Sequence, residues 1–157
     1  LMDAKMIDRL VKIAQEKKIP TYLVGGYVRD KLLGRPSVDI DIVCLGSGIE
    51  LAQLFSSTIP RQPKVTVYKR FGTAMVQYKN LELEFVGARK ESYSPDSRKP
   101  SVEEGTLEDD QNRRDFTINA LALSLNSNDY GTLIDPFGGK EHLNQKLIKT
   151  LQYESFE

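Results

Sequence analysis

Hydrophobic residues recur at spacings of three and four between residues 3 and 18, which is the pattern of an amphipathic helix that packs by one face. Pro20 cannot continue such a helix and predicts where it stops. The same periodicity predicts further helices. They cover residues 28–33, 49–56, 110–123 and 141–146.

Between residues 37 and 45 the pattern changes to alternation, which is typical of a β-strand. The predicted core face carries Val38, Ile40 and Ile42, and the opposite face carries Asp39, Asp41 and Val43. Further strands are predicted at residues 22–24, 64–68, 73–78, 81–86 and 133–134. The turns between residues 64 and 86 are too short for parallel crossovers, so we expect an α/β (α+β) fold with a small mixed sheet flanked by helices.

The segment from Ser92 to Gly105 contains two prolines and almost no apolar residues. It has little apolar area to offset the cost of ordering, and it leads towards the basic pair Arg113-Arg114. We therefore expect a mobile loop that acts as a flap.

Composition narrows the class of protein. The chain has 157 residues, 39% hydrophobic and 28% charged, which describes one soluble globular domain and excludes disordered, collagen-like and coiled-coil chains. It has no apolar run of the ~18 to 20 residues that a membrane span needs and no signal-peptide pattern, so we expect a cytoplasmic protein without a membrane partner. Cys44 is the only cysteine, which excludes an internal disulfide, and its apolar neighbours indicate buried packing. The net charge of zero argues against binding nucleic acid by bulk electrostatics alone.

The paired carboxylates Asp39 and Asp41 are the first candidate for chemistry. Two residues apart on a strand, they leave the same face about 7 Å apart at the Cα level. Like charges so close repel each other unless a cation lies between them, and oxygen ligands without nearby His or Cys favour Mg²⁺ or Mn²⁺. The alternative is a solvated sheet face that happens to be acidic.

Gly25-Gly26 ends a predicted strand and opens a helix, so the backbone there could approach a phosphate closely. Arg29 and Lys31 follow near the start of that helix. A tight turn, with Asp30 as a buried partner of Arg29, would explain the same residues. The dinucleotide-binding pattern Gly-x-Gly-x-x-Gly is absent.

Two further motifs extend the candidate site. Glu82 and Glu84 share one face of a predicted strand, where one of them could add a third carboxylate to the acidic pair, or where both could line a solvent-exposed hairpin. In the run from Arg113 to Ala120, the predicted helix makes Asp115 and Asn119 neighbours at positions i and i+4. The paired guanidinium groups before them suit triphosphate oxygens, although a surface salt-bridge network would use the same residues.

These motifs, in this order, resemble the N-terminal head of the bacterial-type (class II) tRNA CCA-adding enzyme and poly(A) polymerase family. The resemblance runs from about residue 21 to residue 150 and rests on four segments. They are Gly25-Gly26-Tyr27-Val28-Arg29-Asp30, Asp39-Ile40-Asp41, Arg113-Arg114-Asp115-Phe116-Thr117-Ile118-Asn119-Ala120 and Ile134-Asp135-Pro136-Phe137-Gly138-Gly139.

The resemblance implies a polymerase β-like nucleotidyltransferase fold and a role for each matching residue. Asp39 and Asp41 would hold two Mg²⁺ ions, with Glu84 as the third catalytic carboxylate. The remaining positions would bind the nucleotide. Gly25, Gly26 and Arg29 would lie at its phosphates, Arg114 would contact it as well, and Asp115 and Asn119 would read the ribose.

The family segment Glu-Asp-x-x-Arg, which selects ATP and CTP by their base edges, is absent from residues 1–157. We therefore expect a single head domain, the N-terminal fragment of a longer enzyme, with base selection and tRNA binding elsewhere. Leu1, which precedes Met2, is interpreted as a cloning addition.

The functional hypothesis is template-independent nucleotidyl transfer from ATP and CTP to an RNA 3′ end by two-metal catalysis, with tRNA CCA addition placed first. Poly(A) tailing would use the same chemistry and is the alternative. A metal-dependent phosphohydrolase and a non-catalytic RNA-binding module are kept as different classes. The order of nucleotide addition and the oligomeric state are left open.

Overall fold

The computed structural model describes residues 2–92 and 101–146, and its centre is a seven-stranded mixed sheet. The order of the strands is β3-β4-β5-β2-β1-β8-β9. The only parallel pair in this sheet joins β2 to β5, and the other neighbours are antiparallel. The strands are β1 (Thr21–Val24), β2 (Asp39–Cys44), β3 (Val65–Tyr68), β4 (Thr73–Tyr78), β5 (Leu81–Gly87), β8 (Ala122–Ser124) and β9 (Leu133–Ile134). The predicted fold class is confirmed.

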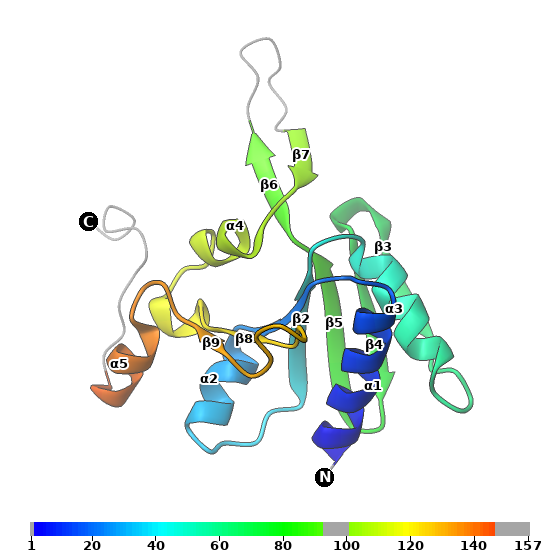
Figure 1. Cartoon of the computed structure of the whole chain (residues 1–157), viewed down its shortest axis with the longest axis horizontal. Helices are drawn as coiled ribbons and strands as arrows, with labels where there is room; N and C mark the ends of the chain where they lie inside the picture. Colours follow the sequence, from blue (N-terminus) through cyan, green and yellow to red (C-terminus); the bar gives the residue numbers. More distant parts are fainter. Residues whose placement is uncertain (1, 93–100, 147–157) are drawn as a thin grey trace.

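Two helices, α1 (Met2–Glu16) and α3 (Gly48–Ser57), cover one face of the sheet (Figure 1). The main core lies between them and the strands, where Leu10, Phe55 and Phe85 are fully buried. Ile40 and Ile42 of β2 belong to this core and have no exposed surface, as the alternation predicted. The period-2 pattern thus decides which face of β2 meets the helices.

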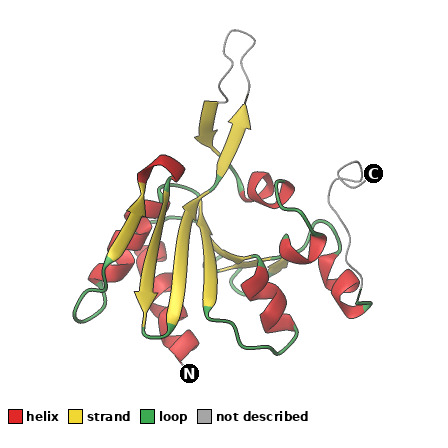
Figure 2. Ribbon diagram, turned by 180° about the vertical axis from the view of Figure 1, so that it is seen from behind, coloured by secondary structure: helices red, strands yellow, loops and turns green. Residues whose placement is uncertain are grey.

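The opposite face of the sheet is covered only in part. Seen from behind, β3, β4, β5 and the lower part of β2 face the viewer without a helix over them (Figure 2). Beside this open region, Val43 packs in a second, smaller core that also contains Val24, Ala88, Leu107 and Ala122. The other helices and strands of the described residues lie outside the main sheet. They are α2 (Gly26–Leu32), α4 (Leu107–Asn112), α5 (Gly139–Asn144), the short 3-10 helices η1 (Lys69–Phe71) and η2 (Thr117–Asn119), and the strand pair β6 (Arg89–Ser92) and β7 (Ser101–Glu104).

The helix predicted over residues 110–123 is wrong. The structure has α4, η2 and β8 in its place. A capping box starts α4 early, since the side chain of Thr106 accepts from the backbone N–H of Asp109 while that of Asp109 accepts from the N–H of Thr106. Further on, Ala122 and Leu123 pair with β1 as a strand, and this tertiary pairing overrides the helical spacing.

The loop predicted over residues 92–105 is wrong at both of its ends, because β6 and β7 pair there as antiparallel strands. Strand pairing satisfies backbone groups without needing apolar side chains, so composition did not reveal it. The middle of the predicted flap, residues 93–100, lies outside the described residues.

Val38 differs from the prediction on a smaller scale. It precedes β2, and 51% of its side chain is exposed, so it does not belong to the core face. Its carbonyl accepts from the backbone N–H of Glu82 at 2.7 Å, which holds it beside β5. The remaining predicted helices and strands agree with the structure to within about two residues at most ends, the usual uncertainty of boundaries.

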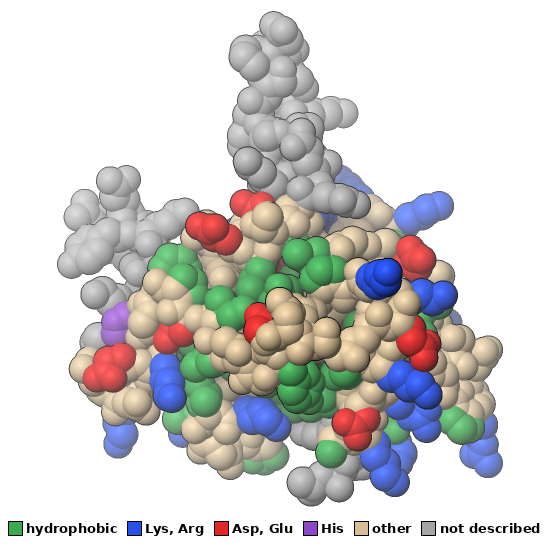
Figure 3. All heavy atoms as spheres, in the orientation of Figure 1, with side chains coloured by type: hydrophobic (Ala, Val, Ile, Leu, Met, Phe, Trp, Pro, Cys, Tyr) green, Lys and Arg blue, Asp and Glu red, His purple; other side chains and the backbone are tan. Residues whose placement is uncertain are grey.

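Charged side chains of both signs are interspersed over the face that carries α1, around a central group of hydrophobic side chains (Figure 3). In residues 2–92 and 101–146, no helix is long and apolar enough to cross a membrane.

Candidate functional site

The acidic pair lies on the open face of the sheet. Asp39 is exposed and Asp41 is half-buried, while Ile40 between them points into the main core. The prediction that both carboxylates leave the face opposite the core is therefore confirmed. Their strand lies at the centre of the sheet, between β1 on one side and β5 on the other.

Gly25 brings two of the predicted site residues together. It follows β1, whose last residue Val24 pairs with Asp41, and it has a backbone conformation (φ 72°, ψ −146°) that is essentially restricted to glycine. A Cβ atom at this position would lie 3.0 Å from Nη1 of Arg114 and 3.1 Å from Oδ2 of Asp41. The bare backbone of Gly25 thus lies against both the guanidinium group of Arg114 and the Asp41 carboxylate.

Glu84 lies on the other side of Asp41. The two residues are direct partners in the parallel pairing of β2 and β5, and Asp39 is the partner of Glu82 one step earlier. Burial raises the pKa of Glu84, the neighbouring Asp41 raises it further, and Arg114 opposes the shift. Glu84 is half-buried beside Asp41, whereas Glu82 is exposed.

Burial also raises the pKa of Asp41. Arg114 opposes this shift, while the negative charges of Asp39 and Asp110 add to it. The fold therefore gathers carboxylates whose charges disfavour one another, with one guanidinium group as partial compensation.

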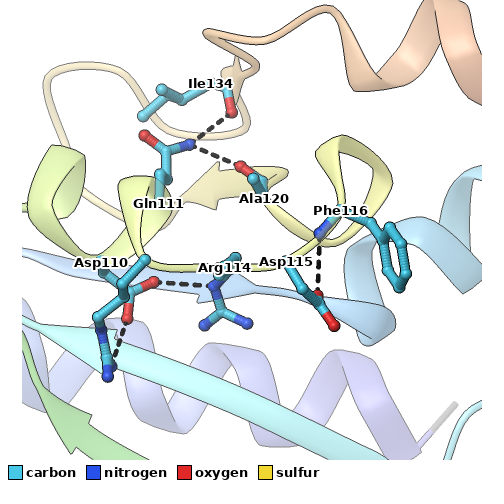
Figure 4. A network of polar contacts seen from close by, with 8 residues as sticks. Asp110, Gln111, Arg114, Asp115, Phe116, Ala120 and Ile134 are labelled. Atoms are coloured by element: carbon cyan, nitrogen blue, oxygen red, sulfur yellow. Dashed lines mark hydrogen bonds and ion pairs between the residues drawn. The ribbon is translucent and has the colours of Figure 1, made fainter. Parts of the chain in front are cut away.

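Arg114 is held in place by a buried carboxylate that the sequence analysis missed (Figure 4). Asp110 has no exposed surface, and its two oxygens accept from Nη2 of Arg113 and from Nε of Arg114, each at 3.0 Å. An aspartate four residues before an arginine is a recognisable helical pair, so this spacing could have indicated it. Asp110 binds Nε of Arg114, and Nη1 of the same guanidinium group lies against Gly25.

Arg29 and Asn119 form a second group beside the glycines. Nη1 of Arg29 donates to Oδ1 of Asn119 at 3.0 Å, and its Nε donates to Asp30 at 3.1 Å. A Cβ atom on Gly26 would lie 3.2 Å from Nη2 of Arg29, so this guanidinium group folds over the start of α2. Asp30 is thus a partner of Arg29, as the alternative interpretation expected, although it is half-buried and not buried.

Asp115 does not neighbour Asn119 on a helix, contrary to the prediction. It is exposed in the bend between α4 and η2, where its carboxylate accepts from the backbone N–H of Phe116 at 2.9 Å (Figure 4). The helical i, i+4 argument for this pair therefore fails, because the chain leaves the helix at Arg113.

Gln111 and Asp135 are supporting residues that the sequence analysis did not assign. The buried amide of Gln111 donates to the carbonyl oxygens of Ala120 and Ile134, at 2.9 and 3.1 Å (Figure 4). Asp135 accepts from the backbone N–H groups of Gly139 and Lys140 at the start of α5. Together they tie η2, β9 and α5 to the helix that carries Asp110.

The donor set suits a hard cation, but the carboxylates are not drawn together in advance. Asp39 and Asp41 offer oxygen ligands only, the type that Mg²⁺ prefers. In the described part of the chain, no three His, Cys, Asp or Glu side chains cluster closely enough to hold a metal ion.

Comparison with known proteins bears on this geometry. The family model described as Poly A polymerase head domain matches residues 21–149. The A-adding tRNA nucleotidyltransferase of Aquifex aeolicus (strain VF5) is 47% identical over 137 residues, which cover 86% of this chain and 16% of that protein. The CCA-adding enzyme of Anoxybacillus flavithermus (strain DSM 21510 / WK1) is 42% identical over 132 residues, covering 83% of this chain and 31% of that enzyme.

Solved structures agree in fold. A tRNA nucleotidyltransferase complexed with a primer tRNA and an incoming ATP analog superposes with a TM-score of 0.78 at 43% identity, over 91% of this chain and 39% of that one. The chain thus spans less than half the length of these relatives. The family match covers most of the chain and every segment on which the resemblance rested, and we conclude that this protein belongs to the Poly A polymerase head domain family.

Proposed function

We propose that this chain is the catalytic head of an enzyme that transfers nucleotides from ATP and CTP to the 3′ end of an RNA, most specifically tRNA. One observation carries the proposal: the bare backbone of Gly25 lies against both Asp41 and Arg114. A nucleotidyl transferase needs a cationic group for phosphates directly beside its acidic groups. The close approach of Arg114 and Asp41 across the backbone of Gly25 supplies this arrangement.

In this proposal, the positive groups bind the triphosphate. Arg114 places Nη1 against Gly25, and Arg29 lies over Gly26 with Nη2 towards the glycine. Guanidinium groups bind phosphate oxygens through paired, charge-assisted hydrogen bonds. Asn119 holds Arg29 at 3.0 Å and would act on the nucleotide partly through it, while the exposed Asp115 would meet the ribose from the adjoining bend.

The acidic residues would hold divalent metal. Asp39 and Asp41 would ligate two Mg²⁺ ions, and Glu84, the strand partner of Asp41, would serve as the third carboxylate. When bound, such ions stabilise negative charge on the transferring phosphoryl group and on the attacking and leaving oxygens. Burial raises the pKa of Asp41 and the charge of Asp39 adds to this shift, and a divalent cation would relieve the repulsion between the two carboxylates.

The relatives support a tRNA substrate. Other solved structures similar to this chain include a tRNA-processing enzyme with CTP and a CCA-adding enzyme with ATP, at 42% and 37% identity. Poly(A) tailing is the second candidate, because the matching family is named for that activity and the chemistry is the same. A phosphohydrolase has less support, because it would need a general base beside the acidic pair. The only histidine of the chain, His142, lies on α5, and its Nδ1 is hydrogen-bonded to the hydroxyl of Thr117 at 2.8 Å.

We also propose that the chain acts as one head domain within a longer enzyme that works in the cytoplasm on tRNA. The similar proteins are about three to six times longer than the matched segment, since the match covers 16% to 35% of them. Base selection would then rest on residues other than the phosphate-, metal- and ribose-facing groups named here.

The test is a transfer assay on the complete gene product. The enzyme is incubated with Mg²⁺ and with tRNAs that lack CCA, CA or A, each nucleotide is supplied separately, and the product ends are sequenced. Defined addition of C and A, or of A alone, supports a tRNA nucleotidyltransferase, and long adenosine tails support a poly(A) polymerase.

Two variants make that assay specific. Asp41→Asn should abolish transfer, whereas Asp8→Asn, at an exposed position on α1, should leave it intact. Failure of the wild-type protein to extend any of these RNAs, or full activity of Asp41→Asn, would overturn the proposal.

A further inference from the structure

The acidic pair borders an uncovered part of the sheet, and the proposed function does not yet use it. Two rows of residues cross this face from β2 towards β3. In the first, Asp41 is followed by Glu84, Met75 and Thr66, and in the second, Asp39 is followed by Glu82 and Gln77. Each residue of a row is the direct strand partner of the one before it. The rows therefore run across neighbouring strands from the acidic pair towards the edge of the sheet.

This face is accessible. Thr66, Gln77 and Glu82 are exposed and Met75 is half-buried, while the alternate residues Ala74, Val76 and Leu83 point into the core beneath α3. The view from behind shows β5, β4 and β3 lying open here (Figure 2). A hollow of about 440 Å³ lies on it and includes Lys64, Thr66, Tyr68, Met75, Gln77 and Glu82 in its lining.

The direction of the reaction assigns this face to the RNA. In phosphoryl transfer, the attacking and leaving oxygens lie roughly in line on opposite sides of the phosphorus. The triphosphate-binding groups, Arg114 and Gly25, lie on the β1 side of Asp41, because Gly25 continues β1. The attacking 3′-hydroxyl must therefore approach from the other side of Asp41, where Glu84 begins the open face.

The chemistry of the hollow suits single-stranded RNA. Tyr68 is 44% exposed at its outer end, and Phe71, just beyond it in η1, is 55% exposed. Aromatic rings of this kind stack on nucleotide bases, and Met75 adds an apolar floor. Lys64, which precedes β3, and Lys69 and Arg70, which follow it, are exposed and can pair with backbone phosphates.

Span and charge agree with this assignment. From β2 to β3 is three interstrand steps of about 4.8 Å, or about 14 Å, which is room for the last two or so nucleotides of a strand. The basic residues lie at the β3 end and the acidic ones at the β2 end. A strand with its hydroxyl at the acids and its phosphates further out would meet both, whereas an apolar protein segment would leave Lys64, Gln77 and Glu82 without use.

We propose that the open face of β5, β4 and β3 binds the 3′-terminal nucleotides of the RNA, with Tyr68 as a stacking surface for a base. This inference rests on the proposed function, because it assigns a place to the second substrate of the same site.

The experiment is a titration of the 157-residue chain, followed by nuclear magnetic resonance of its methyl and amide groups. The ligand is a single-stranded RNA hexamer that ends in CC with a free 3′-hydroxyl. Signals of Thr66, Met75 and Gln77 should shift, and those of α1 should not. Tyr68→Ala should weaken RNA binding about tenfold, the effect of losing one base–aromatic stack, whereas Tyr68→Phe should keep it.

Tyr130→Ala is the matched control, because Tyr130 is also exposed, at 55%, but lines a hollow beside Ala4 and Ile7 of α1 on the other face of the sheet. Unchanged RNA affinity in Tyr68→Ala, shifts confined to the α1 face, or no shift at millimolar RNA would each overturn the proposal. A separate titration with ATP follows Gly25, Gly26 and Arg114. If ATP does not bind while RNA shifts the open face, the proposed function fails and the RNA surface stands. If ATP binds and RNA does not, the proposed RNA surface fails and the proposed function stands.

Discussion

Asp110 and Arg114 form an ion pair in which the carboxylate is completely buried and the guanidinium group reaches the site. Nε of Arg114 donates to Oδ2 of Asp110 at 3.0 Å, and 24% of the arginine side chain is exposed. A buried carboxylate that binds two arginines fixes their directions more than it stabilises the fold, because its desolvation offsets much of the attraction. Asp110 is therefore a positioning residue for Arg114.

Asp110→Asn should weaken nucleotide binding while leaving the acidic pair in place. The amide keeps one acceptor oxygen, so one of the two arginine contacts is lost, and a hydrogen bond to a charged group contributes ~1.5 to 3 kcal/mol. We expect the KM for ATP to rise about tenfold or more, with a smaller change in the KM for RNA. Steady-state kinetics of the complete gene product measures both.

Glu108→Gln is the control for this variant, because Glu108 is exposed in the first turn of the same helix. It removes one negative charge from α4 without touching either arginine. An equal rise in the KM for ATP in both variants would show that the net charge, and not the position of Arg114, determines ATP binding.

Gly25→Ala should impair both stability and nucleotide binding. Its backbone conformation costs a residue with a side chain ~1 to 3 kcal/mol, and the added methyl group would lie 3.0 to 3.1 Å from Arg114 and Asp41. Urea unfolding should show the loss of stability, and calorimetric titration with ATP should show weaker binding.

Gly34→Ala separates the two effects. Gly34 also has a positive φ of 69°, but a Cβ atom there would meet nothing within 4 Å. It should lower the free energy of unfolding through its positive φ alone, and so by less than Gly25→Ala does, and it should leave ATP affinity unchanged. A Gly25→Ala protein that binds ATP as tightly as Gly34→Ala does would refute the crowding argument.

Asp41→Asn should be as stable as the wild-type protein or more stable at pH 7. Burial and Asp39 raise the pKa of Asp41, so the fold favours its protonated form, and the stability gained from protonation is full below about 3.8 and is lost as the pH rises through the folded pKa. At pH 7 the ionised group therefore opposes folding, and the neutral amide removes that opposition. Urea unfolding without metal checks the direction.

Metal provides the complementary measurement. Mg²⁺ that binds the native state alone should raise the melting temperature of the wild-type chain in proportion to occupancy. In Asp41→Asn this rise should be reduced or lost. An identical Mg²⁺-dependent rise in both proteins would exclude Asp41 as a ligand.

Cys44 should be unreactive in the folded protein. Burial raises the pKa of its thiol to about 12, with a smaller contribution from Glu50, so almost no thiolate exists at pH 8. A thiol-specific chromogenic reagent should label it only after denaturant is added. The protonated thiol favours the folded state fully below about 9, and this contribution is lost as the pH rises towards 12. Rapid labelling of the native chain at pH 8 would contradict this burial.

Local patterns predicted those parts of the site that depend on local geometry. Alternation along β2 placed Asp39 and Asp41 opposite the core, and the glycine pair after a strand marked the turn that reaches Asp41. Helical spacing gave a wrong prediction between residues 110 and 123, because Ala122 and Leu123 pair as a strand with β1, which is about 100 residues away in sequence. The same dependence on distant partners hid Gln111, whose amide role is visible only once Ala120 and Ile134 lie beside it.

The parallel pairing of β2 with β5 also affects when the head can fold during translation. Asp41 and Glu84 meet only after α3, β3 and β4 have emerged and folded back, since parallel neighbours require a long connection. Arg114 is made later still, because it lies just after the end of α4. Contacts so distant in sequence form slowly, and a growing chain that has not yet reached residue 114 has the acidic pair without Arg114. The order of residues along the gene therefore delays a competent site until nearly the whole sheet has closed.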